Sequence, residues 1–460
     1  MELSKEQSNA LNLIKSGKNI LIQGSAGSGK SHLIRYIVIS KILNKKIHIT
    51  AMTGTAAVLL GCDATTFHSW VFKDLGNKSV EEYVKMINSK YIWLQSWRTT
   101  SIVVVDEVSM MTAELLDKFD KIARIVRKEP GKPFGGIQLI LTGDFFQLPP
   151  IIEDAHTADV PVELSKRLCF EWDEFPYYFK VIEFNQNFRQ QSDLKYQQIL
   201  NRIRLGECLN SDVMELEKRM IEVPEGLIKP TKLHTLRKDV QYINDMKLDK
   251  LEGRSMSWSQ ELNLEYDSES LVQKELNKPM IERFRKSHAD EIQNRLDKFD
   301  KNNQHESELI LKIGAQVMLI FNLDVKNGLA NGSRGVVVDI LEDMPIVLFT
   351  NGLKIPITSV SWTVHIWDNK AKLTRSQIPL KLAYAISIHK SQGLTLDYAE
   401  IDIGSSVFEF GQAYVALSRV KNLEGLFLRA FDKTKIKAHP RVLEWYSKLV
   451  VLGNKEEYKS

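Results

Sequence analysis

The sequence predicts an α/β protein that contains parallel β-sheets, and three observations lead to this prediction. First, residues 20–22, 47–51, 101–105 and 138–142 are short and largely apolar, which is typical of strands buried on both faces of a sheet. Second, a glycine-rich loop follows the first of these segments and leads into a helical pattern, the order found in nucleotide-binding folds. Third, the apolar stretch 382–388 is followed by a polar turn, so parallel-sheet structure is expected again late in the chain.

The composition is that of a folded globular protein without a strong charge bias. The chain has 460 residues, enough for two to four domains, and 43% of them are hydrophobic and 26% charged. A net charge of +4 permits a nucleic-acid partner but does not by itself indicate one. The three cysteines lie far apart without metal-ligand spacing, and reduced thiols are expected at Cys62, Cys169 and Cys208.

Neither a membrane-spanning segment nor a targeting signal is predicted. No apolar run approaches the roughly 20 residues that cross a bilayer. The segment after Met1 has no apolar leader and no basic transit pattern, so neither a signal peptide nor a transit peptide is expected. The prediction is a cytoplasmic protein of the bacterial or viral type, with no membrane partner.

A phosphate-binding loop is the most specific motif, with the spacing Gly24-x4-Gly29-Lys30-Ser31. Its glycines let backbone amides turn toward a phosphate, and the following helix adds its positive N-terminal end. Lys30 is predicted to reach the β- and γ-phosphates of ATP, and the Ser31 hydroxyl to bind Mg²⁺. The predicted ATP-binding residues of this loop are Gly24, Ser25, Ala26, Gly27, Ser28, Gly29, Lys30 and Ser31. The alternative is a glycine-rich turn ahead of a helix, but strand, loop and helix in this order favour nucleotide binding.

Gln7 lies in an amphipathic helical pattern just before the loop, for which Ser4 is a plausible N-cap. An amide side chain both donates and accepts hydrogen bonds, so Gln7 is a candidate for contacting adenine. The spacing leaves this interpretation and an ordinary helix position equally open.

Polar residues at the ends of two apolar segments provide the catalytic candidates. Asp106 and Glu107 follow residues 101–105, where Asp106 can bind Mg²⁺ and Glu107 can orient and deprotonate the attacking water. Gln147 follows residues 138–142 and can sense the γ-phosphate. A pair of carboxylates after one strand is common, but downstream of a phosphate loop it is specific.

Two polar and aromatic segments are candidates for binding a single strand of nucleic acid. Thr53, Gly54 and Thr55 follow an apolar strand, and small residues there let a backbone approach closely. Phe67 and His68 offer flat faces on which bases can stack. The alternative is a helix N-terminus together with aromatic residues of the core.

The middle of the chain changes character twice. Residues 255–310 are richer in charged residues than the chain average, and apolar residues recur there at helical spacing, so a charged helical insertion is expected. Residues 311–364 contain short strand-like runs separated by Asn-Gly turns, which suggest a small sheet or barrel.

The order of the motifs resembles the superfamily-one helicases, and in particular the Pif (petite integration frequency) family of DNA helicases, which is related to the RecD and Dda helicases. The resemblance rests on five sequences in addition to the phosphate loop: DEVSM (106–110), PFGGIQ (133–138), GDFFQLPP (143–150), HKSQGLTLD (389–397) and ALSR (416–419). LKIGAQVMLIFN (311–322) and NGSRGVVV (331–338) are similar to the Src-homology-type barrel of that family. The resemblance covers nearly the whole chain.

This resemblance implies two RecA-like motor domains, a small wedge insertion that carries Trp93 and Trp97, and an inserted small β-barrel. The expected boundaries are 1–184 for the first motor domain with the wedge at 72–100, 185–254 and 372–450 for the second motor domain, 255–310 for the charged helical insertion, 311–371 for the barrel and 451–460 for a polar tail.

The resemblance also assigns roles to residues of the second half. Arg189, within NFRQ (187–190), and Arg419 are expected to reach the γ-phosphate, and Gln392 and Gly393 to lie at the nucleotide. From the residues alone, a helix cap or a surface ion pair is the favoured role of Arg189. The residues expected to contact single-stranded DNA are Thr53, Gly54, Thr55, Phe67, His68, His389, Lys390 and Ser391.

The implied function is an ATP-dependent DNA helicase that moves 5′ to 3′ and acts in DNA replication, repair, recombination or telomere maintenance. Its cofactors would be ATP and Mg²⁺. Its partners would be single-stranded DNA, forked or tailed duplexes, and G-quadruplexes or RNA–DNA hybrids, with the protein acting as a monomer. An ATP-driven translocase or protein-stripping remodeller with little unwinding is the first alternative. A non-motor ATPase, such as a phosphate-loop kinase or a ring-forming ATPase, is the second, and HKSQGLT together with ALSR disfavours it.

Overall fold

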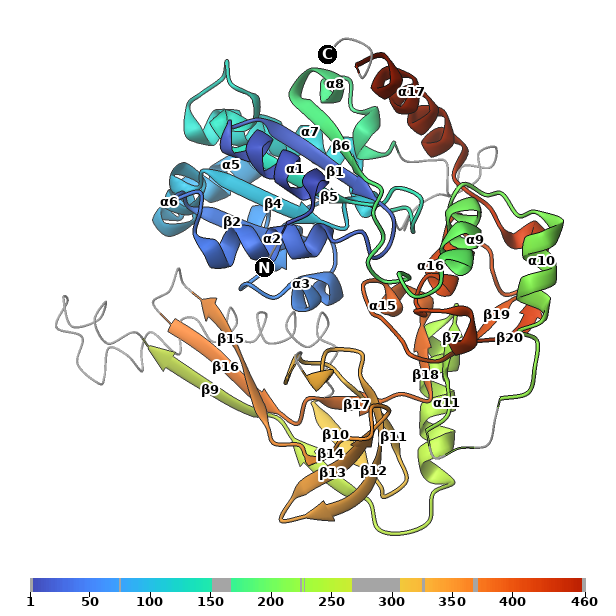
Figure 1. Cartoon of the computed structure of the whole chain (residues 1–460). Coiled ribbons are helices and arrows are strands. Elements are labelled where there is room, and N and C mark those ends of the chain that lie inside the picture. Colours follow the sequence, from blue (N-terminus) through green and yellow to red (C-terminus); the bar gives the residue numbers. More distant parts are fainter. Residues whose placement is uncertain are drawn as a thin grey trace.

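The fold of this computed structural model consists of two units with parallel sheets and an antiparallel region, arranged around the middle of the molecule (Figure 1). The structure describes residues 3–73, 76–150, 167–223, 226, 228–266, 307–324, 327–366 and 371–456. In Figure 1 the first unit lies at the upper left, the second unit at the right and the antiparallel region at the bottom.

The first unit is built on a parallel sheet whose strand order is β3-β2-β4-β5-β1-β6. Its strands are β1 (Asn19–Gly24), β2 (Ile47–Ala51), β3 (Thr65–Thr66), β4 (Ile102–Asp106), β5 (Gln138–Gly143) and β6 (Phe179–Phe184). Its helices are α1 (Lys5–Lys15), α2 (Lys30–Ser40), α3 (Gly54–Leu60), α4 (Phe67–Val71), α5 (Val80–Ser89), α6 (Tyr91–Thr99), α7 (Ala113–Arg127) and α8 (Phe175–Tyr178), with 3₁₀ turns at Val108–Met110, Pro133–Gly136 and Cys169–Glu171. The predicted apolar strands are therefore confirmed.

Alternating side chains of these strands form two separate cores, one on each face of the sheet. Ile20 and Ile22 pack with α1 and α2, whereas Leu21 between them packs with α7 and with the aromatic residues near it. This is why the strand is apolar at every position. The start of α1 is set by a capping box, in which Ser4 and Gln7 exchange backbone and side-chain hydrogen bonds.

The second unit has a smaller parallel sheet with the strand order β18-β7-β19-β20. Its strands are β7 (Thr231–His234), β18 (Ala385–Ser387), β19 (Ala399–Ile403) and β20 (Leu426–Phe431). Its helices are α9 (Leu194–Arg204), α10 (Asn210–Glu217), α11 (Arg237–Asp249), α15 (Ile388–Ser391) and α16 (Gln412–Leu417), with 3₁₀ turns at Leu423–Gly425 and Lys433–Lys435. Helix α16 is buried along its whole length, which places the residues beside it at the centre of the molecule.

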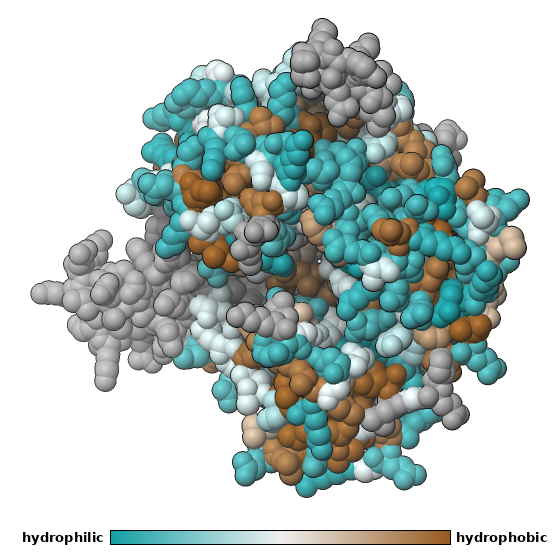
Figure 2. Space-filling model, viewed as in Figure 1, coloured by the Kyte–Doolittle hydropathy of each residue, from teal (hydrophilic) through white to brown (hydrophobic). Residues whose placement is uncertain are grey.

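The antiparallel region lies between β7 and β18 in the chain and forms three sheets. A five-stranded sheet has the order β14-β13-β12-β11-β17, a three-stranded sheet the order β15-β16-β9, and β10 pairs with β8. The strands are β8 (Met256–Ser259), β9 (Glu261–Tyr266), β10 (Glu308–Leu311), β11 (Gln316–Leu319), β12 (Arg334–Leu341), β13 (Met344–Phe349), β14 (Lys354–Pro356), β15 (Val360–Ile366), β16 (Ala371–Gln377) and β17 (Leu380–Leu382). Apolar side chains gather over this region at the bottom of the view in Figure 2, and Ile313, Leu341 and Leu353 are among its exposed apolar residues.

Two expected boundaries in this region are wrong. Residues 256–266 form strands rather than part of a helical insertion, because β8 pairs with β10 and β9 with β16. The parallel sheet resumes at β18 and not at residue 372, since β16 and β17 belong to the antiparallel sheets. The helical pattern expected within 267–306 lies outside the described residues, and the barrel stays a prediction.

The last helix, α17 (Pro440–Glu456), differs from the expectation in two ways. It was expected to complete the second motor domain, but Val442, Trp445 and Tyr446 pack into the aromatic core of the first unit. Trp445 stacks on Phe170 with ring centroids 4.4 Å apart. The helix also includes residues 451–456, which were expected to belong to a polar tail.

The two helices α5 and α6 occupy the segment where a wedge was expected. Trp97 is fully buried and stacks on Trp70 with ring centroids 5.2 Å apart, so this segment is packed firmly onto the first unit. Its role as a wedge stays a prediction. Among the described residues, no helix combines the length and apolar character needed to cross a membrane.

Candidate nucleotide-binding and catalytic site

The phosphate loop has the expected strand–loop–helix geometry. Strand β1 ends at Gly24 and α2 begins at Lys30, with the loop between them. Gly27 and Gly29 have φ angles of +86° and +85°, a left-handed conformation that favours glycine. A Cβ atom at Gly27 would lie 2.5 Å from the Cβ of Arg189, so glycine is also required by the close approach of the second unit.

Lys30 is partly buried and is bonded within this loop. Its Nζ donates to the Gly24 carbonyl at 2.8 Å, to the Ser25 carbonyl at 3.0 Å and to the Ser28 hydroxyl at 3.3 Å. Burial lowers the pKa of Lys30, while the carboxylates of Asp144, Glu107 and Asp106 oppose that effect. The loop thus presents one cation together with the backbone amides of a helix N-terminus, which suits a phosphate chain.

Ser31 and Asp106 form the arrangement expected of a magnesium site. The Ser31 hydroxyl donates to Asp106 Oδ2 at 3.3 Å, and Thr142 and the backbone N–H of Glu107 donate to Asp106 Oδ1 at 2.6 and 2.9 Å. The described residues hold no cluster of three His, Cys, Asp or Glu side chains that could bind a metal. The oxygens of Ser31 and Asp106 suit Mg²⁺, which usually takes one or two protein oxygens, several waters and the phosphates of a nucleotide.

Glu107 meets Gln147 and Gln392 at the contact between the two units. Gln392 Nε2 donates to Glu107 Oε2 at 2.9 Å and to Gln147 Oε1 at 3.1 Å. Burial, followed by the charge of Asp106, raises the pKa of Glu107 to about 7. A carboxyl group with a pKa near neutrality is matched to the task of a general base. Residues from three distant motifs thereby share one polar cluster.

The two arginines both lie at this contact. Arg189 Nη1 donates to the Ser418 carbonyl at 3.0 Å, and its pKa is lowered to about 9 by burial and by the charge of Arg419. Arg419 is fully buried and bonded within its own unit, with its Nε donating to the Val415 carbonyl at 2.7 Å and its Nη1 to the Ser391 carbonyl at 3.2 Å. Arg419 therefore also holds segments of the second unit together, a role that was not expected from the sequence.

The segment that carries Arg189 lies directly on the phosphate loop. The backbone N–H of Phe188 donates to the Gly27 carbonyl at 2.9 Å, and the Asn187 side chain donates to the Ala26 carbonyl at 3.0 Å. Gln7 donates to the Gly29 carbonyl at 3.2 Å and accepts from the backbone N–H of Ser4, so both ends of its amide are bonded within the chain.

Phe188 is a residue that the sequence analysis overlooked. Its ring is 41% exposed and lies 3.1 Å from the position of a Cβ at Gly29. An exposed aromatic face at the start of α2, beside Gln7, is suited to contact a nucleotide base. The sequence offered one indication that Phe188 lies at the site, namely its position next to Arg189 within NFRQ.

Gly393 lies at the same contact between the units as Gln392. It has a φ of +82°, and a Cβ there would come 2.8 Å from the Leu59 side chain of α3. The polar turn after α15 therefore lies against the first unit, and the expected position of Gly393 at the nucleotide stays a prediction.

The candidates for DNA contact differ in their exposure. Lys390 is exposed, and His389 is partly exposed and lies 3.2 Å from Glu409. Ser391 is fully buried, and its hydroxyl donates to the Ile388 carbonyl, so a DNA contact through this hydroxyl is not supported.

The candidates of the first unit lie on α3 and α4. Thr53 caps α3 by accepting from the backbone N–H of Ala56 at 3.1 Å, and Gly54 and Thr55 begin that helix. His68, on α4, is partly exposed. All four are accessible enough for their expected role, which stays a prediction.

Phe67 is buried in the aromatic core, so the expectation that it stacks on a base is wrong. Its exposed fraction is 0%, and its ring packs edge-on against Phe119 with centroids 5.4 Å apart. The pattern of aromatic residues in 65–70 did not distinguish a stacking platform from a core, and here the alternative interpretation holds for Phe67.

A Phe67→Ala variant is therefore expected to lose stability. Removing a buried phenylalanine typically costs about 3–5 kcal/mol, so the free energy of unfolding should fall by that amount while the affinity of the folded protein for single-stranded DNA is unchanged. Denaturant titration together with DNA binding below the unfolding transition checks this. A stable variant with weakened DNA binding would contradict the assignment to the core.

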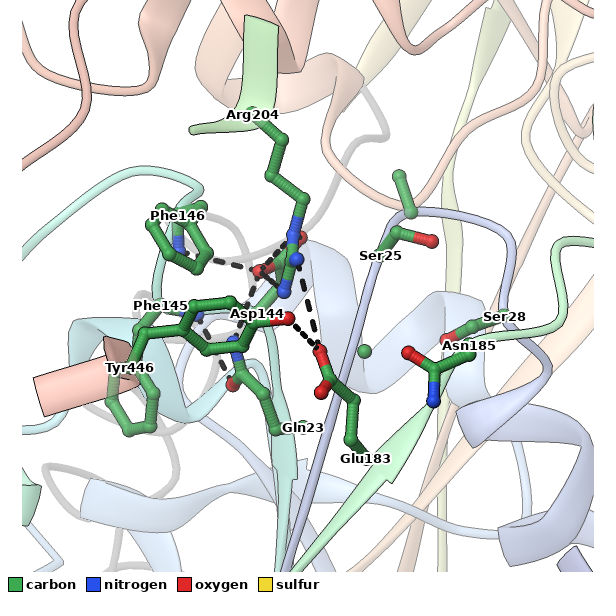
Figure 3. A network of polar contacts seen from close by, with 12 residues as sticks. Gln23, Ser25, Ser28, Asp144, Phe145, Phe146, Glu183, Asn185, Arg204 and Tyr446 are labelled. Atoms are coloured by element: carbon green, nitrogen blue, oxygen red, sulfur yellow. Dashed lines mark hydrogen bonds and ion pairs between the residues drawn. The ribbon is translucent and has the colours of Figure 1, made fainter. Parts of the chain in front are cut away.

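Asp144 and Arg204 are further residues that the sequence analysis did not identify. They form a buried ion pair between the units, surrounded in Figure 3 by Gln23, Phe146, Glu183 and Tyr446. Asp144 could have been identified from the sequence, because it is the acidic residue of GDFFQ and directly follows a buried strand. Nothing in the local sequence distinguishes Arg204 from other arginines of an amphipathic helix.

Comparison with known proteins agrees with this geometry. A sequence model of the family described as PIF1-like helicase matches residues 2–213, and one described as the DNA helicase Pif1 2B domain matches residues 293–340. The ATP-dependent DNA helicase PIF1 of Xenopus laevis is 37% identical over 98% of this chain and 65% of its own length. The chain thus spans slightly less than two thirds of that relative.

Solved structures give the same result over nearly the whole chain. The Pif1 helicase from Candida albicans has a TM-score of 0.73 and 31% identity, with 98% of this chain and 100% of that chain covered. Bacteroides Pif1 in complex with ADP-AlF4 has a TM-score of 0.74 and 26% identity, covering 99% and 98% of the two chains. Bacteroides Pif1 bound to ssDNA has a TM-score of 0.60 and 27% identity, covering 98% and 97%. An identity above 30% across almost the full length of a Pif1 helicase is decisive, and the chain belongs to the PIF1-like helicase family.

Proposed function

We propose that this protein is an ATP-dependent DNA helicase that moves along single-stranded DNA from 5′ to 3′ and unwinds duplex DNA. The observation that carries the proposal is the contact of Gln392 with both Glu107 and Gln147. One residue of the second unit thereby touches the proposed base and the proposed γ-phosphate sensor of the first. A change at the phosphates can therefore move the units relative to each other, which is what a motor needs.

The proposed chemistry is the attack of water on the γ-phosphorus of ATP. The Glu107 carboxylate takes a proton from the water, the new P–O bond forms, and the bond to the β–γ bridging oxygen breaks to release ADP. Lys30, Arg189 and Arg419 stabilise negative charge on the transferred group. When bound through Ser31 and Asp106, Mg²⁺ would neutralise charge on the β- and γ-phosphate oxygens.

The proposed DNA partner is supported by the relatives. The similar solved structures include Bacteroides Pif1 bound to ssDNA. Another is described as the structural basis for DNA unwinding at forked dsDNA by two coordinating Pif1 helicases. We extend these ligands to this chain, with the exposed parts of α3 and the segment 389–390 as the first contacts to test. G-quadruplex and RNA–DNA hybrid substrates, action as a monomer, a cytoplasmic location and roles in replication, repair, recombination or telomere maintenance belong to the same proposal.

Unwinding of matched tailed duplexes tests the proposal. With ATP and Mg²⁺, the protein is expected to separate a duplex with a 5′ single-stranded tail and to leave the same duplex with a 3′ tail paired. A Lys30→Ala variant, which lacks the phosphate-loop cation, should separate neither. Product from the 3′-tailed substrate alone would overturn the proposed direction.

Two further outcomes of this experiment identify the alternatives. DNA-stimulated ATP hydrolysis without strand separation would indicate a translocase or a protein-stripping remodeller. ATP hydrolysis that does not respond to DNA would indicate a non-motor ATPase.

A further inference from the structure

A buried ion pair joins the two units next to the phosphate loop. Arg204, at the end of α9, approaches Asp144 from the second unit with its Nε 3.1 Å from both carboxylate oxygens. Asp144 is 0% exposed and Arg204 7% exposed. The guanidinium also lies 4.5 Å from the Phe146 ring centroid and 5.5 Å from that of Tyr446. Figure 3 shows these two rings beside the pair. A charged pair this deeply buried requires good geometry and additional hydrogen bonds.

Asp144 also accepts hydrogen bonds from elements near the nucleotide. Gln23, on the strand that leads into the phosphate loop, donates to Oδ1 at 3.2 Å, and the backbone N–H of Phe146 donates to the same atom at 3.3 Å. The Tyr414 hydroxyl donates to Oδ2 at 3.2 Å. Asp144 therefore fixes Tyr414 from one side and the strand before the loop from the other.

Tyr414 carries this connection into the phosphate loop itself. Its hydroxyl oxygen accepts a hydrogen bond from the backbone N–H of Ala26 at 3.0 Å. The phenol has one O–H donor, which it uses in the hydrogen bond to Asp144. Its oxygen can therefore accept a hydrogen bond from the loop. Burial, followed by the charge of Asp144, raises the pKa of Tyr414, so the hydroxyl keeps its proton at neutral pH.

Tyr414 lies on the helix that precedes the two arginine contacts. It is part of α16, while Ser418, directly after that helix, accepts from Arg189 through its carbonyl and from Arg419 through its hydroxyl. A single short helix therefore holds the phosphate loop at one position and the arginine side chains one turn later. A shift of this helix changes both distances together.

We propose that Tyr414 is a positioning residue for ATP hydrolysis, which holds the phosphate loop in register with Arg189 and Arg419 through the Asp144–Arg204 pair. The inference rests on the proposed ATP-hydrolysing function of the site. Tyr414 touches the loop backbone and not the reacting atoms. Its hydroxyl keeps the loop and the arginines at a constant separation, so that bound ATP meets a preorganised set of charges.

The test compares two tyrosine-to-phenylalanine variants, one at Tyr414 on α16 and one at Tyr196 on α9. Tyr414→Phe removes the hydroxyl that contacts Ala26. Tyr196→Phe is the matched control, because Tyr196 is equally buried and its hydroxyl donates to the Leu417 carbonyl at 2.7 Å, at the other end of α16. Both variants lose one buried hydroxyl that joins α16 to another element, but only Tyr414→Phe loses contacts with the phosphate loop and with Asp144.

The expected result is a difference in turnover. For Tyr414→Phe, the kcat of DNA-stimulated ATP hydrolysis should fall about 10–100-fold relative to Tyr196→Phe, the size of effect that small misplacements produce. ATP affinity should stay within about threefold. Hydrogen exchange of the peptide that contains residues 24–31 should rise in Tyr414→Phe and not in Tyr196→Phe. Equal kcat values and equal exchange in the two variants would overturn the proposal.

A second variant keeps the test decisive if Tyr414→Phe does not fold. Arg204→Lys retains the positive charge but loses the planar contact with Asp144, so it should increase exchange of the same peptide and lower kcat by a smaller factor. No increase in exchange would overturn the proposal. A wild-type protein without DNA-stimulated ATPase activity would refute the proposed function instead, and the exchange measurement would still decide whether Tyr414 holds the loop.

Discussion

ATP turnover by a Glu107→Gln variant is expected to fall about a thousandfold or more, while ATP affinity stays within a few-fold of the wild-type value. General base catalysis typically contributes 10²–10⁴-fold, and glutamine keeps the size of the side chain without its basicity. The contact with Gln392 can persist through the amide oxygen, so the closed arrangement of the units should be retained. Single-turnover hydrolysis and equilibrium nucleotide binding measure the two quantities.

Two control variants separate this effect from others. Glu114→Gln, on the exposed start of α7, makes the same chemical change away from the site and should hydrolyse ATP normally. Lys30→Ala should lose ATP binding as well as turnover, because Lys30 is the cation inside the phosphate loop. Normal turnover in Glu107→Gln would mean that another group activates the water.

Because Glu107 is assigned as the general base, its raised pKa predicts that ATP hydrolysis depends on pH. A pKa of about 7 means that the Glu107 carboxyl group is protonated and inactive as a base below that pH, and ionised above it. The kcat/KM for ATP reports the free enzyme, so it should rise about tenfold per pH unit below 7 and level off above. Glu107→Gln should lack this rise in its residual activity. A flat wild-type profile between pH 6 and 8 would contradict the role of Glu107 as the titrating base.

The sequence was sufficient for features that depend on local spacing. The phosphate loop, the strands β1, β2, β4 and β5 and the acid pair at the end of β4 each follow from residue types within about ten positions. Their geometry is set by the backbone locally, as the left-handed Gly27 and Gly29 show. The resemblance to a helicase family then supplied Gln392, Arg189 and Arg419, whose neighbours come from distant segments.

What the sequence did not reveal depends on packing between distant elements. Phe67 looks the same in a binding platform and in a core, and only its contacts with Phe119 decide between them. Arg204 occupies an ordinary position of an amphipathic helix, yet its partner Asp144 lies 60 positions earlier in the chain. Helix α17 continues the second unit in sequence but completes the core of the first through Trp445.

Removing either arginine is expected to cut ATP turnover by about a thousandfold or more, the typical effect of an arginine that stabilises a transferring phosphoryl group. Nucleotide affinity and single-strand affinity should stay within a few-fold for Arg189→Ala and Arg419→Ala, since charge on the transferred group develops mainly in the transition state. Arg219→Ala is the matched control. That side chain also donates to carbonyl oxygens of the second unit, at Leu426 and Glu424, but makes no contact with the phosphate loop.

The two variants should differ in stability, although they share the loss of turnover. Arg419 donates to the carbonyls of Val415, Ser391 and Leu394, whereas Arg189 donates to one carbonyl, at Ser418. Buried carbonyls left without donors are costly, so Arg419→Ala should have the lower melting temperature of the two. If turnover followed the melting temperature across Arg189→Ala, Arg419→Ala and Arg219→Ala, both arginines would be structural. If Arg189→Ala lost its turnover with an almost unchanged melting temperature, the charge delivered across the two units would be the cause.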